Sequence, residues 1–189
     1  MALAAVGVWQ AGHGAWIYAK AQLGQLLLQR AWARTLAGEA EVKPWPWADT
    51  WPVARLRAPA HGVDLIVLDG VSGRTLAWAP GHAGVSAPLG APGPAIISGH
   101  RDTHFRFLER LKPGDQIVVD TPGRPPARFH VREATVVDSR TAVIRRDVGT
   151  TALVLVTCYP FNAVTPGGPL RYVVVAEAAS PVARRISSD

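Results

Sequence analysis

The chain has one cysteine, Cys158, at the end of the apolar run LVLVTC. A lone thiol there is either a small buried side chain or a nucleophile. A nucleophilic thiol needs a group that favours the thiolate, donors for an oxyanion, and a fixed backbone. His100 ends the apolar run PAIISGH, and Arg171 lies at the start of LRYVVVAEA. If the runs around Cys158 and Arg171 are neighbouring strands, their side chains meet at one edge of the sheet.

His100 also begins the motif HRDTH, which permits two other interpretations. A kinase catalytic loop carries H-R-D, but the chain lacks a glycine-rich loop and D-F-G. A zincin has H-E-x-x-H, and Arg101 stands where its catalytic glutamate must be. A zinc site built from His100, His104 and either Asp102 or His82 is left open, and would make the chain a metal-dependent enzyme.

Composition indicates an all-β domain. The 189 residues are 48% hydrophobic and 18% charged, enough for one domain with a core and an extension. The 18 glycines and 16 prolines lie between short apolar runs, as expected of strands joined by turns. The net charge of +6 is dispersed and not interleaved with aromatics, so no nucleic-acid partner is expected.

Apolar periodicity predicts one long helix over residues 15–38, followed by strands. The Pro/Trp-rich segment 43–62 is interpreted as an extended stretch covering the barrel, because its prolines exclude a regular helix. The sequence DGVSG predicts a hairpin turn between the first two strands. The expected strands are 63–70, 73–81, 94–100, 115–121, 127–138, 151–158 and 170–178, with a short helix over 103–115.

Three ordered motifs resemble the sortases, the membrane-anchored cysteine transpeptidases of bacterial surfaces: ISGHRDTHFRFLERLKPGD, LVLVTCYP and GGPLRYVVVA. The sortase signature is T-L-x-T-C. Leu155, Thr157 and Cys158 match it, while Val154 replaces its first threonine. The resemblance covers about residues 63–178. Together with the Pro-Trp-Pro-Trp sequence, the pattern is most similar to the Gram-negative sortases called class GN or the marine proteobacterial type.

The resemblance implies an all-β fold, an eight-stranded sortase-like β-barrel with short helices, preceded here by the long N-terminal helix. It also implies that Cys158 attacks the Thr–Gly bond of an LPxTG-like C-terminal sorting signal on a secreted protein and forms a thioester. His100 would act as general acid and base, and Arg171 would donate to the substrate carbonyl or the oxyanion. An amine acceptor on the cell envelope or on another protein would resolve the thioester.

Three further residues are expected to bind substrate. Thr157 lies beside the nucleophile. Val143 and Ile144 lie in the loop 139–150, where sortases usually read their signal, and are expected to line an apolar groove for the substrate leucine. No cofactor is implied, since no acidic cluster stands where calcium could bind. We expect a monomer.

The first 19 residues are apolar and approach the roughly 20 needed to cross a bilayer. Lys20 and Arg30 follow them, so the positive-inside rule alone would keep the domain in the cytoplasm. The sortase resemblance instead favours a single-pass inner-membrane protein with its catalytic domain on the periplasmic side. The predicted divisions are a membrane anchor or its trimmed remnant over 1–19, a helix and Pro/Trp-rich segment over 20–62, the catalytic barrel over 63–180, and a polar tail over 181–189.

Two other functions fit the same residues. With water as acceptor, the site would be a hydrolase, in effect a cysteine peptidase, and only a product assay with an added amine separates it from a transpeptidase. A non-catalytic envelope β-domain would instead bind partners through its Trp-rich segment, and Cys158→Ala would leave its function intact.

Overall fold

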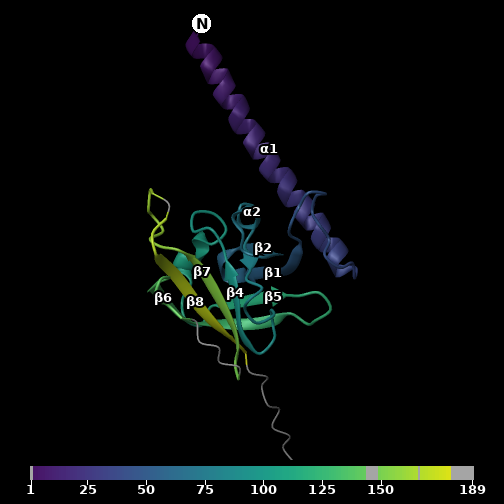
Figure 1. The fold of residues 1–189 in the computed structure, drawn as a ribbon, viewed down its shortest axis with the longest axis vertical. Coiled ribbons are helices and arrows are strands. Elements are labelled where there is room, and N and C mark those ends of the chain that lie inside the picture. The colour runs from purple at the N-terminus through teal and green to yellow at the C-terminus, as the bar shows by residue number, and fades with distance from the viewer. Residues whose placement is uncertain (1, 144–148, 166, 180–189) are drawn as a thin grey trace, which may run out of the picture.

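A closed β-barrel and one long helix make up the computed structural model of the protein, which describes residues 2–143, 149–165 and 167–179 (Figure 1). Within these residues, eight strands follow the order β1-β2-β3-β4-β7-β8-β6-β5 around the barrel. The predicted fold class is therefore confirmed. The elements are α1 (Ala2–Leu36), β1 (Pro52–Ala58), η1 (Pro59–His61), β2 (Val63–Asp69), α2 (Gly73–Leu76), β3 (Gly81–His82), β4 (Gly93–Ser98), η2 (Arg106–Arg110), β5 (Gln116–Asp120), β6 (Ala127–Asp138), β7 (Thr151–Cys158) and β8 (Leu170–Ala178).

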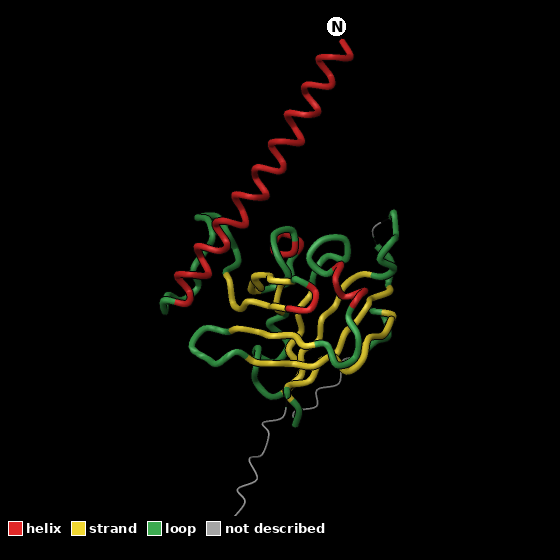
Figure 2. Tube along the Cα trace, turned by 180° about the vertical axis from the view of Figure 1, so that it is seen from behind, coloured by secondary structure: helices red, strands yellow, loops and turns green. Residues whose placement is uncertain are grey.

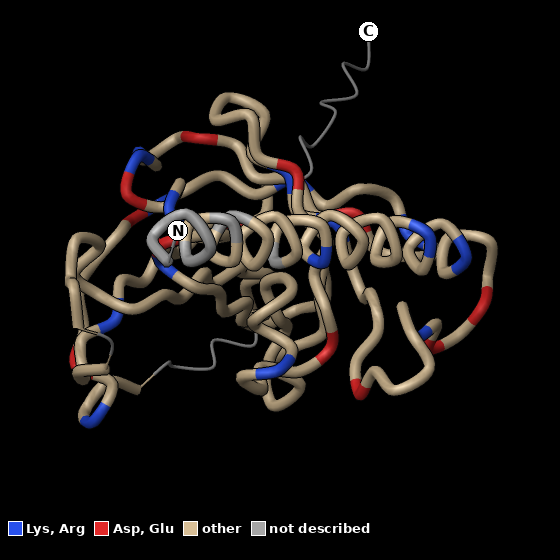
Figure 3. Tube along the Cα trace, turned by 90° about the horizontal axis from the view of Figure 1, so that it is seen from above, with Lys and Arg blue, Asp and Glu red and all other residues tan. Residues whose placement is uncertain are grey.

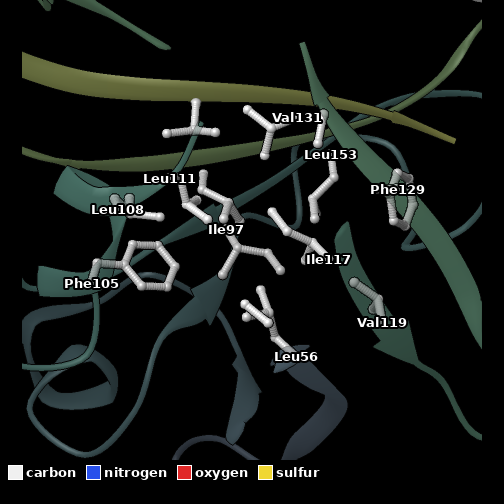
Figure 4. Packing of buried hydrophobic residues seen from close by; sticks show 14 of the residues in the cluster. Leu56, Ile97, Phe105, Leu108, Leu111, Ile117, Val119, Phe129, Val131 and Leu153 are labelled. Atoms are coloured by element: carbon white, nitrogen blue, oxygen red, sulfur yellow. The ribbon is translucent and has the colours of Figure 1, made fainter. Parts of the chain in front are cut away.

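Alternating side chains fill the barrel, because successive residues of a strand point to opposite faces. In β4 and β7 the inward residues include Ile97, Leu153 and Leu155, all fully buried. Ile97 and Leu153 lie between Phe105 on one side and Phe129 on the other, within one buried cluster (Figure 4). Each such side chain contributes about 1.5–3 kcal/mol when removed from water. The outward faces of the same strands are left to form surface sites.

Only the C-terminal half of α1 packs on the barrel, while its N-terminal half projects away from it (Figures 1 and 2). Leu28 and Trp32 are buried against a small apolar cluster that includes Leu68 and Ala79. In the projecting half, Trp16 is 64% exposed. Seen from above, lysines and arginines are interspersed with acidic residues along the Cα trace (Figure 3).

The predicted membrane anchor is wrong. No helix of the described residues has a stretch long and apolar enough to span a bilayer. The apolar count of residues 2–19 comes largely from alanine and glycine, which favour the hydrocarbon core far less than leucine or isoleucine, and Gln10 and His13 interrupt it. The prediction of a single-pass inner-membrane protein, which rested on this segment, is contradicted by the same finding.

Two local predictions also differ from the structure. Residues 73–81 do not form a hairpin strand: Ser72 caps the short helix α2 by accepting a hydrogen bond from the Thr75 backbone N–H at 3.1 Å. The chain then returns as β3, which is parallel to β2 and only two residues long. The Pro/Trp-rich segment 43–62 contains a full barrel strand, β1, whose alternation of buried and half-buried residues was hidden by the surrounding prolines.

Candidate active site

The register of three neighbouring strands brings the predicted catalytic residues to one end of the sheet. β4 is parallel to β7, with Gly93 opposite Thr151 and Ser98 opposite Val156, a constant offset of 58 positions. The same offset places His100, just beyond β4, level with Cys158. β8 is antiparallel to β7 and pairs Arg171 directly with Cys158. Residues far apart in sequence therefore converge, as required of a nucleophile, a base and an oxyanion donor.

Cys158 lies on the outward face of β7. Leu153 and Leu155 point into the core, so the period of two turns Val154, Val156 and Cys158 outward. The thiol is free and its residue is half-buried. The nucleophile predicted from the sequence is thus accessible from the surface and held by a regular strand.

A groove of about 340 Å³ lies on this same outward face. Its floor includes Val154 of β7 and Val173 of β8, which lie on the faces that carry Cys158 and Arg171 further along those strands. Val143, whose side chain is 83% exposed, forms part of the wall. An extended apolar segment laid in the groove would lead toward the thiol. Ile144, predicted to line the groove with Val143, falls outside the described residues.

The backbone just before His100 is fixed by the Cys158 strand. Gly99, which is buried, donates its N–H to the Val156 carbonyl at 3.1 Å. The Thr157 hydroxyl donates in turn to the Gly99 carbonyl at 2.7 Å. A Cβ added at Gly99 would lie 2.8 Å from Cγ of Phe105, so the ring packs directly on the backbone. His100 is therefore anchored by its predecessor while its own side chain is exposed.

Thr157 itself is only 3% exposed and faces away from the groove. The substrate-binding role predicted for it stays a prediction. In the structure, the Thr157 hydroxyl already donates a hydrogen bond to the Gly99 carbonyl. The alternation of Leu153, Leu155 and Thr157 could have indicated this inward orientation from the sequence.

Arg101 forms a second link between the segment that carries His100 and the segment that follows Cys158. Its Nη2 donates to the Ala163 carbonyl at 2.9 Å and lies 3.5 Å from the Thr165 carbonyl, both in the loop between β7 and β8. Sequence reasoning treated Arg101 only as an obstacle to a zincin motif and missed this contact. Its position beside His100 was the one available signal, because a contact between residues 62 apart leaves no local pattern.

Arg171 is held at the start of β8 by the same loop. Its Nη1 donates to the Gly168 and Leu170 carbonyls at 2.8 and 2.9 Å. Within the described residues no hydrogen bond engages its Nε or Nη2, which stay available for a substrate oxygen. Hydrogen bonds from Arg140 keep the pKa of Asp138 below its usual value, and the Arg171 charge adds to this effect.

His104 and His100 line a pocket that shares no residue with the groove. Burial is the main cause that lowers the pKa of His104, and the charge of neighbouring His100 acts in the same direction. Its buried Nδ1 has no hydrogen-bond partner in the described residues. No group of three or more His, Cys, Asp or Glu side chains in that part of the chain is placed to hold a metal ion, so HRDTH does not assemble the zinc site left open above.

Comparison with known proteins agrees with this arrangement. A family model described as a sortase domain matches residues 56–179. Sortase D of Bacillus subtilis (strain 168) is 31% identical over 121 residues, covering 63% of this chain and 60% of the relative. The chain therefore spans about 60% of the length of that curated relative.

Solved structures show the same barrel. A Sortase D5 transpeptidase of Clostridium perfringens is 25% identical, with a TM-score of 0.60 over 69% of this chain and 80% of that one. Sortase A from Corynebacterium diphtheriae matches over 85% of this chain and 86% of its own, with a TM-score of 0.63. At 21% identity, the second likeness shows the shared fold.

Proposed function

This chain belongs to the sortase family, and on that premise we propose that it is a cysteine transpeptidase acting on C-terminal sorting signals. The observation that carries the proposal is the pairing of Cys158 with Arg171 across β7 and β8, with His100 in register on the other side. The proposed nucleophile and oxyanion donor are thus cross-strand neighbours, and the outward face of β7 and β8 also carries the apolar groove, which supports the proposal.

Acylation uses all three groups. The Cys158 thiolate attacks the carbonyl carbon of the scissile peptide bond, and the developing oxyanion accepts hydrogen bonds from Arg171. Arginine suits this role because its guanidinium stays charged at any working pH. Collapse of the tetrahedral intermediate breaks the C–N bond, and the leaving amine takes a proton from the His100 imidazolium. The product is a thioester on Cys158.

Transfer reverses the proton movements. The acceptor amine attacks the thioester carbonyl and gives one proton to His100. The C–S bond breaks, and the thiolate of Cys158 is restored beside a protonated His100. Water in place of the amine would give hydrolysis, so the two activities share one thioester.

The preferred substrate is a secreted protein with an LPxTG-like signal, and the acceptor is an amine on the cell envelope. Support comes from the apolar groove, in which Val143 stands where a branched aliphatic side chain would pack. We propose that Val143 and Ile144 form the pocket for the substrate leucine. The class GN subgroup and the monomeric state stay predictions.

A product assay tests the function. The wild-type protein, Cys158→Ala and His100→Ala are incubated with a panel of LPxTG-type peptides, with and without glycinamide. His130→Ala serves as the matched control, because His130 is a half-buried histidine of β6 that pairs with Gln116 and Glu177 and so lies at the opposite end of β8 from Arg171. We expect an amide product from the wild type and the control only. Products of water alone would identify a cysteine peptidase, and the absence of cleavage across the panel would overturn the proposal.

A further inference from the structure

A second pocket has His100 in its wall. It encloses about 350 Å³ between α1 and the turn that follows β4. Ala21 and Gln25 form the α1 wall, Trp78 lies beside them, and His100 and Asp102 form the opposite wall. The half of α1 that carries Ala21 and Gln25 passes over the barrel near α2 (Figure 1). None of these residues lines the groove, so the two pockets are distinct.

The lining of this pocket suits a cation. The Asp102 side chain is exposed, and within the described residues its carboxylate forms no hydrogen bond or ion pair. Gln25 donates its Nε2–H to the Trp78 carbonyl at 2.9 Å, which fixes the amide and leaves Oε1 as an acceptor. Among the residues that the structure describes, no lysine or arginine lines the pocket, although the chain carries a net charge of +6. An ammonium group would thus meet acceptors and no fixed positive charge.

The reaction also requires an approach from this side. In the thioester, the acyl chain lies toward the groove, where the strand faces of β7 and β8 lead away from Cys158. The incoming amine must reach the carbonyl while its proton faces His100. A pocket that has His100 in its wall and shares no residue with the groove meets both requirements.

We propose that the pocket between α1 and the His100 turn is the acceptor subsite, and that Asp102 and Gln25 hold the ammonium group of a primary amine before transfer. This inference rests on the proposed transpeptidase function and extends it to the acceptor. The acceptor is accordingly an unhindered primary amine that is cationic before it reacts.

The bound ammonium loses one proton to solvent at the open edge of the pocket. The neutral amine attacks the thioester carbonyl carbon, and its second proton passes to His100. As the C–S bond breaks, the electron pair returns to sulfur and Cys158 leaves as a thiolate. The products are an amide and the enzyme with His100 protonated.

The contact of α1 with Trp78 fixes the width of the pocket. A Cβ built on Gly24 would lie 2.3 Å from Cζ3 of Trp78, so the ring lies directly on the helix backbone. Gly24→Ala must therefore displace the helix or the ring. This substitution reshapes the pocket without altering its polar groups, and gives a second, independent way to perturb it.

The test compares two nucleophiles in the same variant. Glycinamide is the cationic probe, and hydroxylamine, which is small and uncharged at neutral pH, is the reference. For Asp102→Asn and Gln25→Leu we expect the ratio of glycinamide product to hydroxylamine product to fall about fivefold or more, since an ion pair or charge-assisted hydrogen bond is lost. Gly24→Ala should lower the ratio as well. Glu109→Gln, an acid-to-amide change in η2 outside this pocket, is the matched control and should keep the wild-type ratio.

The possible results distinguish a failure of the acceptor subsite from a failure of the proposed transpeptidase function. If hydroxylamine resolves the thioester but all variants keep the wild-type ratio, the acceptor subsite lies elsewhere and this inference is overturned. If no thioester forms in the wild type with any sorting peptide, the proposed function itself fails. If Glu109→Gln lowers the ratio as much as Asp102→Asn, a general surface charge effect explains the data and the inference is likewise overturned.

Discussion

Replacing Thr157 by valine should separate the positioning of His100 from the stability of the barrel. The substitution keeps the branched shape and removes the hydroxyl that donates to the Gly99 carbonyl at 2.7 Å. Within the described residues that buried carbonyl has no other donor. An unsatisfied buried acceptor costs about 1–3 kcal/mol, so we expect a stability loss of this size.

The same loss should reduce catalysis. Gly99 is adjacent to His100, and small misplacements of a catalytic group are costly, so kcat/KM for peptide cleavage should fall about tenfold or more. Urea unfolding and peptide cleavage are measured side by side. Thr50→Val is the matched control: Thr50 is 2% exposed, and its hydroxyl donates to the Asp69 carbonyl at 2.7 Å.

The control should lose similar stability and keep its activity. The reasoning is refuted if Thr157→Val cleaves peptide as fast as Thr50→Val at equal stability. In that case the Thr157–Gly99 bond would serve the fold alone, and His100 would be held in place by other contacts.

Four further predictions follow from the contacts around the site. Arg101→Ala removes the link to the β7–β8 loop, so we expect KM for the peptide to rise severalfold and proteolysis within that loop to become faster; unchanged KM and cleavage pattern would contradict this. Arg171→Lys keeps the charge but loses the planar fork, and should lower the acylation rate about 100-fold, as loss of an oxyanion donor does; near-wild-type acylation would exclude that role. Val143→Ala should reduce kcat/KM for a leucine-containing peptide by about fivefold, because apolar burial of the leucine is lost. An equal reduction for the corresponding alanine-containing peptide would argue against a leucine pocket. Hydrogen bonds from the Lys112 N–H and His61 hold the pKa of Asp115 below its usual value of 3.8, so its ionised form stabilises the fold above that pH. Asp115→Asn should therefore lower the free energy of unfolding by about 1 kcal/mol at pH 6, and this loss should vanish as the pH falls through the lowered pKa. A loss that does not change with pH in chemical denaturation would contradict this prediction.

The order of motifs was sufficient to predict the convergence of Cys158, His100 and Arg171. Each of these residues lies at one end of an apolar run, and the ends of neighbouring strands meet at the same edge of a barrel. The long helix and the strands β4 to β8 could be predicted for the same reason. In each of these elements, a regular spacing of apolar residues is bounded by turn residues.

The remaining features depend on contacts that leave no local pattern. β3 is set by its two-residue pairing with β2 and β4, not by its own composition. The Arg101 contact joins a turn to a distant loop. The anchor prediction failed for a different reason, since it counted apolar residues without weighting alanine and glycine by their weak transfer energies.

Intact-mass spectrometry of the protein with sorting peptides would show the proposed intermediate itself. We predict a mass gain equal to the acyl portion of an LPxTG-type peptide on the wild-type protein, absent in Cys158→Ala and discharged by added hydroxylamine. A full complement of unmodified protein across a varied peptide panel, with Cys158 also unreactive toward iodoacetamide at neutral pH, would contradict the assignment of Cys158 as the nucleophile.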